Sequence, residues 1–165
     1  MIDPRANSSE KLTPPYPLPY VSRKALRRIP DFLEPPEHCP SCGNTVLLVN
    51  NREIYGREYG DWPYAYRCID YRGCDSYVGL HPNTDLPLGT LADKPTREAR
   101  KTYKAFFFQW QRINSWSRKQ AYAWLAQHLG IPIDQCHWGF FSVAQAELAG
   151  SICEEALEQM KEVAQ

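Results

Sequence analysis

Four cysteines in the first half of the chain constrain its fold more than any other feature. Two residues separate Cys39 from Cys42, and five separate Cys68 from Cys74. Two thiolates with two residues between them chelate one ion in a tight knuckle, and Gly43 permits the turn that follows. A second pair further along the chain completes a set of four. The pattern therefore predicts a hairpin built around one metal ion.

Zinc is the ion that such a set of ligands favours. Four thiolates give Zn²⁺ a closed tetrahedral coordination, and closed sites are structural rather than catalytic. The spacing between the pairs is slightly longer than usual but fits a zinc ribbon, in which two cysteine pairs close a small antiparallel sheet. We expect zinc to be needed for folding of this segment. The expected ligands are Cys39, Cys42, Cys68 and Cys74.

Spacing alone leaves the fourth ligand open. The gap between Cys68 and Cys74 is wider than the usual two residues, and His38 and His81 lie near enough in sequence to replace Cys74. Four unliganded thiols are the less favoured alternative, because cysteines gathered without a metal would be reactive. The sequence has no signal peptide and no segment apolar enough to span a membrane, so we expect a cytoplasmic protein in which cysteine pairs bind metal.

Composition divides the chain into three segments. Residues 1–37 contain eight of the 14 prolines and predict an extended arm, because proline fixes its own φ and lacks a backbone donor. Residues 38–92 carry β-branched and aromatic runs and predict a zinc-ribbon-like β module. Residues 93–165 change to helical periodicity. The expected strands are residues 45–50, 64–69 and 76–80.

The C-terminal segment predicts three helices, marked by residues that favour helix ends. The fold class is therefore α+β: a zinc-bound antiparallel β module packed against a three-helix half, with a proline-rich extended N-terminal arm. The marking residues are Asp93 or Thr96 for the first helix, Ser117 and Gly130 for the second, and Ser142 with Gln145 for the third.

Short motifs follow one another in order across residues 38–141. They are Cys39-Pro-Ser-Cys42-Gly, Glu53-Ile-Tyr-Gly56, Cys74-Asp-Ser-Tyr77-Val-Gly-Leu-His81, Pro87-Leu-Gly-Thr-Leu-Ala92, Ser117-Arg118, Ala121-Tyr122-Ala-Trp124-Leu-Ala126, Leu129-Gly-Ile131 and His137-Trp-Gly139-Phe-Phe141. This succession resembles a family of small zinc-finger-containing proteins of unknown function, found largely in phages and bacterial mobile elements. The resemblance implies that Cys74 is the fourth ligand, because a wide second cysteine pair before a Tyr-Val-Gly run fits the family. It also implies a phage-like or prophage-like origin and supplies no established activity.

The chain departs from the family's pattern at three positions. Tyr103 and Phe107 stand where the family tends to carry His and Asp, and Ser142 replaces the acidic residue that often follows the His-x-Gly-x-Phe motif. Chemistry that depends on those polar residues is therefore not expected here.

Charge is balanced overall but unevenly spread. The chain has 19 basic and 19 acidic residues. Residues 94–119 hold eight basic residues against Glu98, a net charge of +7, whereas residues 120–165 hold one against six, or −5. Such a basic stretch predicts a phosphate-facing surface, with a merely solvated helix face as the alternative. The basic residues expected to contact nucleic acid are Arg97, Arg100, Lys101, Lys104, Arg112, Arg118 and Lys119.

Aromatic residues interleave with this basic stretch. At helical spacing they are more often core than base-stacking groups, but Phe108 lies off the apolar stripe and is the best candidate for an exposed aromatic. Ala126, Leu129, Gly130 and Ile131 also resemble the turn of a helix-turn-helix, with residues 133–141 as its recognition helix. Pro132 and Gly139 disfavour that interpretation.

No recognisable catalytic constellation is present, so an enzyme is the least favoured class. The best candidate for a catalytic group is His137, which follows Cys136 and lies three residues after Asp134. A role in capping a loop explains His137 more simply. A second metal site from Cys136, His137 and Cys153 would lack a fourth ligand.

Two classes of function remain. The leading hypothesis is a non-enzymatic, zinc-binding, nucleic-acid-binding protein of phage or mobile-element type, because a basic stretch accompanies the predicted ribbon. The alternative is an interaction module that binds and modulates a host protein, such as transcription or defence machinery. The neutral net charge, the proline-rich arm and the acidic C-terminal segment favour the alternative.

Overall fold

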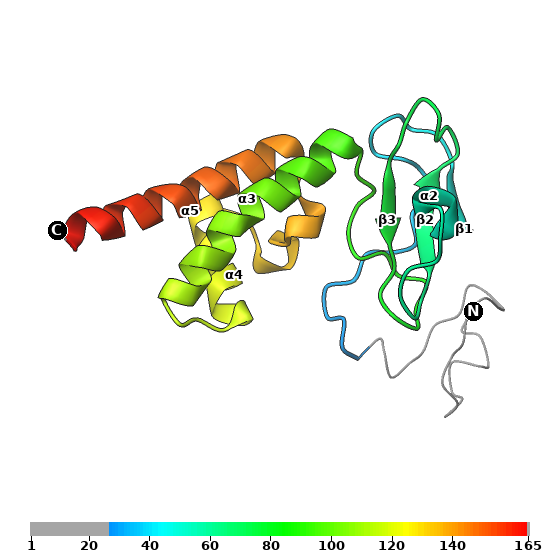
Figure 1. The fold of residues 1–165 in the computed structure, drawn as a ribbon. Coiled ribbons are helices and arrows are strands. Elements are labelled where there is room, and N and C mark those ends of the chain that lie inside the picture. Colours follow the sequence, from blue (N-terminus) through cyan, green and yellow to red (C-terminus); the bar gives the residue numbers. More distant parts are fainter. Residues whose placement is uncertain (1–26, 165) are drawn as a thin grey trace. The chain divides into compact units, whose positions relative to one another are not determined.

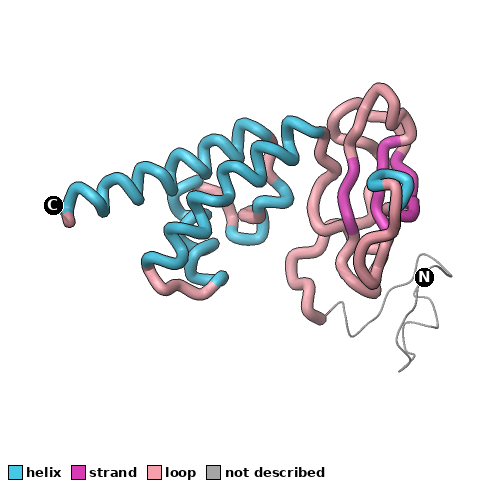
Figure 2. Tube along the Cα trace, viewed as in Figure 1, coloured by secondary structure: helices cyan, strands magenta, loops and turns pink. Residues whose placement is uncertain are grey.

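A computed structural model describes residues 27–164, which form two compact units (Figure 1). The N-terminal unit ends at Asp93 and the helical unit begins at Lys94. Among the described residues, all strands belong to the N-terminal unit and the long helices to the helical unit (Figure 2), which confirms the α+β class. The part of the predicted arm that covers residues 1–26 lies outside the described residues, and residues 27–37 form turns and irregular segments.

The N-terminal unit is built on a three-stranded antiparallel sheet in the order β1-β2-β3. The strands are β1 (Val46–Asn50), β2 (Tyr64–Cys68) and β3 (Tyr77–Gly79), close to the three predicted runs. Between β1 and β2 the chain makes one short helix, α2 (Arg52–Tyr55), which ends at Gly56 with φ of 84°. Gly56 is suited to that left-handed conformation because it has no Cβ.

One face of the sheet forms the core of the N-terminal unit. Leu48 lies opposite Tyr66 on β2, and Tyr66 lies opposite Val78 on β3, so all three side chains are on the same face. Tyr66 packs there with buried Leu80 and Leu91. The sheet is thus covered on this face by the chain that follows β3.

The segment 81–92, predicted as a loop, is fixed to the sheet by side-chain hydrogen bonds. The indole N–H of Trp62 donates to the carbonyl of Thr84 at 2.9 Å, and the Tyr66 hydroxyl donates to the carbonyl of Asp85. The fully buried Thr84 hydroxyl donates to the His81 carbonyl at 2.8 Å and accepts from the Leu86 amide. These bonds satisfy backbone groups that burial would otherwise leave unpaired.

The helical unit contains the three predicted helices, α3 (Lys94–Ile113), α4 (Arg118–Leu129) and α5 (Val143–Val163). Helix α3 begins two residues earlier than Thr96, so that Asp93 immediately precedes it. Figure 1 shows α3 and α5 running alongside each other, with α4 against them. None of the described helices is long and apolar enough to cross a membrane.

The predicted caps of α4 and α5 are confirmed. Ser117 and Gln120 form a reciprocal capping box at the start of α4, with bonds of 3.2 and 2.8 Å. Ser142 and Gln145 form a second one at the start of α5, with bonds of 3.2 and 3.0 Å. Gly130 ends α4 with φ of 68°. Each box satisfies backbone donors that a helix leaves free at its first turn.

A mostly apolar core joins the three helices of this unit. Helices α3 and α5 approach closely at Gly150, where a Cβ would lie 2.4 Å from Cδ1 of Tyr103. A side chain at position 150 would therefore collide with Tyr103. The buried members of the core are Ala99, Phe107, Ala121, Tyr122, Leu125, Ala126, Cys136, Trp138, Phe141, Ala146, Ala149 and Cys153.

The helix-turn-helix alternative is wrong. Residues 133–141 form two separate 3₁₀ turns, η2 (Ile133–Gln135) and η3 (Trp138–Phe140), rather than a recognition helix. The cause is burial: Trp138 and Phe141 point into the core of the helical unit. A segment that anchors two aromatic side chains there has no continuous helical face to place in a groove of DNA.

Candidate metal centre

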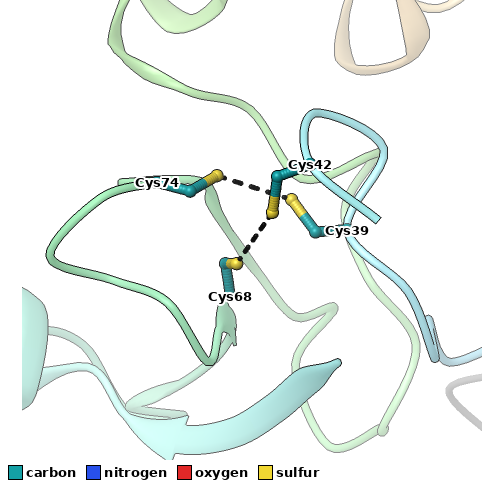
Figure 3. Close-up of side chains that lie close together, drawn as sticks. All are labelled: Cys39, Cys42, Cys68 and Cys74. Carbon is teal, nitrogen blue, oxygen red and sulfur yellow. Dashed lines mark hydrogen bonds between the residues drawn. The ribbon is translucent and has the colours of Figure 1, made fainter. Parts of the chain in front are cut away.

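Four cysteine sulfurs converge at one end of the N-terminal unit (Figure 3). Cys39 and Cys42 come from the loop before β1, Cys68 is the last residue of β2, and Cys74 lies in the loop between β2 and β3. The sulfur–sulfur distance is 3.7 Å between Cys39 and Cys74 and 3.4 Å between Cys42 and Cys68. All four sulfurs lie within 4.8 Å of one another.

The first cysteine pair sits in a knuckle closed by backbone hydrogen bonds. The amide of Cys39 donates to the carbonyl of Asn44, and the amide of Gly43 donates back to the carbonyl of Cys39, both at 2.8 Å. Gly43 has φ of 78°, in the left-handed region that its lack of a Cβ allows. The Asn44 side-chain amide also donates to the Cys42 sulfur at 3.4 Å.

The second pair owes its wide spacing to a turn. The amides of Gly73 and Cys74 both donate to the carbonyl of Asp70, at 3.0 and 2.6 Å. This turn bends the chain back after β2, so that Cys74 returns to the side on which Cys68 ends the strand. The amide of Cys68 in turn donates to the carbonyl of Ser76 at 3.0 Å. Five intervening residues are thus what this turn requires.

The donor set fits a zinc ion. Four sulfurs at about 2.3 Å from a tetrahedral Zn²⁺ lie about 3.8 Å apart, which is compatible with the two distances of 3.4 and 3.7 Å and with the upper bound of 4.8 Å for the whole set. All six cysteines of the chain are free thiols, so no disulfide competes for these sulfurs. Four thiolates leave no coordination position for a substrate, which makes the centre suited to holding the fold rather than to chemistry.

The surroundings of the four thiols favour ionisation at one of them. Burial raises the pKa of Cys39, but hydrogen bonds from the Cys42 and Ser41 amides, with smaller contributions from Ser76 and Cys74, lower it overall to about 7. Burial raises the pKa of Cys68 to about 12. A bound metal replaces the remaining thiol protons, because only thiolates coordinate zinc.

The alternative nitrogen ligands do not join the cluster. Among the described residues, neither His38 nor His81 belongs to the group of metal-ligating side chains. His38 pairs with Thr45 in an isolated β-bridge that continues into β1. Burial lowers the pKa of His81, whose ring lines a small cavity beside Ile29 and Pro82.

A second metal site at Cys136, His137 and Cys153 is not formed by the described residues. Both cysteines are fully buried, and burial raises the pKa of the Cys136 thiol to about 11 and that of Cys153 to about 12. The His137 ring packs against the rings of Tyr122 and Phe140, with centroids 5.6 and 4.6 Å away. The two thiols therefore act as small apolar core groups.

Four of the seven predicted basic residues line one groove of the helical unit. The groove measures about 520 Å³ and includes Phe108 and Trp138 in its walls. Arg118 is near enough to contribute, after burial, to lowering the pKa of Lys104. Arg112 and Lys119 are exposed and do not line the groove. The four basic residues in the groove are Arg97, Arg100, Lys101 and Lys104.

One polar residue that sequence reasoning missed supports the cysteine cluster. Ser76 is fully buried; its hydroxyl accepts from the Cys74 thiol at 3.3 Å and donates to the Ser41 hydroxyl at 3.1 Å. It therefore links the two cysteine-bearing loops. Its proximity to Cys74 in sequence is the only local signal, because the contact with Ser41 depends on how the two loops meet.

Comparison with known proteins matches the sequence to a described family. The model of a family described as a zinc-finger-containing domain matches residues 35–160, a range that includes the four cysteines and the basic groove. No curated protein and no solved structure matches the chain significantly.

Proposed function

The chain belongs to this family of zinc-finger-containing domains, and on that premise we propose that it is a non-enzymatic protein that binds nucleic acid through the groove on α3. Zinc would have a structural role, held by the thiolates of Cys39, Cys42, Cys68 and Cys74. The observation that carries the proposal is the convergence of four basic side chains and one exposed aromatic ring in a single groove.

Positive charge is concentrated along one side of α3. Arg97, Arg100, Lys101 and Lys104 recur at spacings of one, three and four residues and so lie within one helical face. The guanidinium of Arg100 donates from Nε to the carbonyl of Phe141 at 2.8 Å, which fixes the position of this guanidinium. A surface of this kind suits the regular negative charge of a phosphate backbone.

Phe108 adds an apolar group to the basic groove. Its side chain is 41% exposed, and the ammonium of Lys104 lies 5.1 Å from its ring centroid. A cation held against an exposed ring can contact a phosphate while the ring contacts a sugar or base. This pairing favours nucleic acid over a simple anion as the occupant of the groove.

The proposal is tested by fluorescence anisotropy with a labelled single-stranded DNA and the matching duplex at low salt. Lys101→Gln/Lys104→Gln should weaken binding to both probes. The matched control is Arg112→Gln/Lys119→Gln, which removes the same charge outside the groove and should have a smaller effect. Absence of binding by the wild-type chain at low salt, where the electrostatic contribution is strongest, would contradict the proposal.

A phage or mobile-element origin is part of the proposal and is supported by the succession of motifs in residues 38–141. Such a protein would act on nucleic acid in the bacterial cytoplasm. Chromatin-style immunoprecipitation from a bacterial host that expresses the tagged chain should recover nucleic acid. Recovery should fall with the Lys101→Gln/Lys104→Gln variant if the groove is the site.

A second candidate is modulation of a host protein, and one observation favours it. The helical unit carries an apolar groove of about 790 Å³ whose walls include Trp110, Trp124, Ile152 and Met160. Pull-down from a bacterial lysate, with and without nuclease, separates the two candidates. A partner that survives nuclease and is lost with Met160→Glu favours protein binding, whereas one that vanishes with nuclease favours nucleic acid.

A further inference from the structure

The sheet face opposite the core carries a row of exposed and half-exposed side chains. Leu47, Arg67 and Tyr77 are consecutive partners across β1, β2 and β3, so they share this face. Helix α2 lies against the same face, because Nη1 of Arg67 donates to the carbonyl of Glu53 at 3.3 Å. The ring of Tyr55, also in α2, packs edge-on against Tyr77 with centroids 5.8 Å apart.

Further aromatic rings extend this row. Tyr59 packs edge-on against Tyr55 at 5.3 Å, and the guanidinium of Arg67 lies 4.0 Å from the ring centroid of Tyr71. Tyr55, Tyr59 and Tyr71 are 48%, 46% and 45% exposed. We call this set the tyrosine–arginine face, comprising Tyr55, Tyr59, Arg67, Tyr71 and Tyr77, with Arg57 and Arg72 at its edges.

Among the described residues, the arginines of this face contact aromatic rings rather than carboxylates. Arg57 lies 4.4 Å from the ring centroid of Tyr59, and Arg72 lies 5.9 Å from that of Tyr71. In the part of the chain that the structure describes, neither these two nor Arg67 forms an ion pair. The face therefore places planar guanidiniums against planar, partly exposed rings.

We propose that the tyrosine–arginine face binds the unpaired bases of single-stranded nucleic acid by stacking. Bases splayed from a single strand stack on tyrosine rings and on guanidinium planes, and the phosphates between them pair with the arginines. Arg67 and Tyr77 lie on neighbouring strands, and Tyr55 in α2 and Tyr59 and Tyr71 in the loops flank them, so that successive bases can reach successive side chains. The proposal rests on the proposed function and adds the form of nucleic acid that the chain prefers.

This face and the α3 groove differ in what they recognise. Phosphate contacts in the groove are available in single and double strands alike, and their strength falls steeply with salt. Stacking requires bases that are free of a partner and depends less on salt. A chain with both surfaces binds single strands more tightly than duplexes.

The test compares a 20-nucleotide poly-thymidylate strand with a duplex of the same length. Tyr59→Ala/Tyr71→Ala should lower affinity for the single strand by about 30-fold or more and leave affinity for the duplex unchanged. Tyr71→Phe keeps the ring and should bind like the wild type. Phe32→Ala, which removes a ring of equal exposure (46%) outside the face, is the matched control and should have no effect.

Zinc content and the far-ultraviolet circular dichroism of each variant should equal those of the wild type, which separates lost binding from lost folding. Equal affinity of the double variant and the wild type for the single strand would overturn the inference while leaving the groove proposal intact. A wild-type chain that binds neither probe would overturn both. Loss of a captured lysate protein with unchanged single-strand binding would assign the face to a protein partner and also overturn the inference.

Discussion

At the scale of single residues, the position of Cys74 depends on the turn that precedes it. Two amides, those of Gly73 and Cys74, converge on the carbonyl of Asp70 and bend the chain toward the other three sulfurs. The hydroxyl of Ser76 then holds the Cys74 sulfur at 3.3 Å. A few short hydrogen bonds therefore decide which side chain completes the four-sulfur cluster.

Replacing Cys74 should remove the metal. The wild type should contain one zinc per chain, whereas Cys74→Ser should lose tight binding because a serine hydroxyl is a poor zinc ligand. Cys136→Ser is the matched control: it changes a buried cysteine outside the cluster and should retain zinc. Zinc content is measured by elemental analysis after dialysis. Full zinc occupancy in Cys74→Ser, lost only when His81→Ala is added, would show that a histidine supplies the fourth ligand.

Local sequence signals predicted the cysteine cluster but not its support. The spacing of Cys39 and Cys42 and the resemblance that included Cys74 were sufficient to predict which four cysteines cluster, because knuckles form between near neighbours. The hydrogen bond between Ser76 and Ser41 could not be predicted. It joins two loops that are distant in sequence and exists only once the sheet has formed.

At the scale of elements, one face of α3 packs in the core of the helical unit and another face carries the basic residues of the groove. Phe107 is 1% exposed and packs against Tyr122 and Trp138, with ring centroids 4.9 and 5.9 Å away. The basic residues of the groove lie around Phe108 on another side of the helix. The family resemblance associated polar residues with positions 103 and 107, and here aromatic side chains at both positions contribute to packing in the helical unit.

The close approach of α3 and α5 should make Gly150 intolerant of a side chain. Gly150→Ala places a Cβ within 2.4 Å of Cδ1 of Tyr103 and should lower the free energy of unfolding by about 1–3 kcal/mol through overpacking. Urea denaturation measures the change. In a Tyr103→Ala background, which removes Cγ and Cδ1 and leaves only Cβ near position 150, the same substitution should cost less. An equal cost in both backgrounds would mean that the helix contact is not the cause.

The helix boundaries were predictable because capping depends on neighbouring residues. The secondary structure of residues 133–141 was not predictable from the local sequence. Ser117, Gly130 and Ser142 act on neighbours within a few positions, so their roles follow from the sequence. Whether the segment after Pro132 forms a helix depends on where Trp138 is buried. That burial results from tertiary packing on α3 and overrides local pattern.

At the scale of the whole molecule, metal and packing stabilise different parts. The N-terminal unit has a small core around Tyr66, Leu80 and Leu91 and four sulfurs at one end of its sheet. The helical unit has a separate, larger core. A small sheet rarely buries enough apolar surface to fold alone, so zinc should contribute a large share of the stability of the N-terminal unit.

Removing the metal should therefore affect the two units unequally. Chelation with excess EDTA should abolish the dispersed amide signals of the N-terminal unit in a nuclear magnetic resonance spectrum, because its loops lose their anchor. The helical signals should persist, and added zinc should restore the spectrum. Unchanged signals in both units after complete metal removal would contradict a structural role for zinc.

Contact between the α3 groove and phosphates is the central feature of the proposed function. The most direct measurement is the slope of the logarithm of the binding constant against the logarithm of salt concentration, for the wild type and for Lys101→Gln/Lys104→Gln. Two lost phosphate contacts should reduce the steepness of the slope by roughly 1.4–1.8. Arg112→Gln/Lys119→Gln should leave the slope closer to that of the wild type, because these residues do not line the groove. Identical slopes for the wild type and the groove variant would contradict such contact.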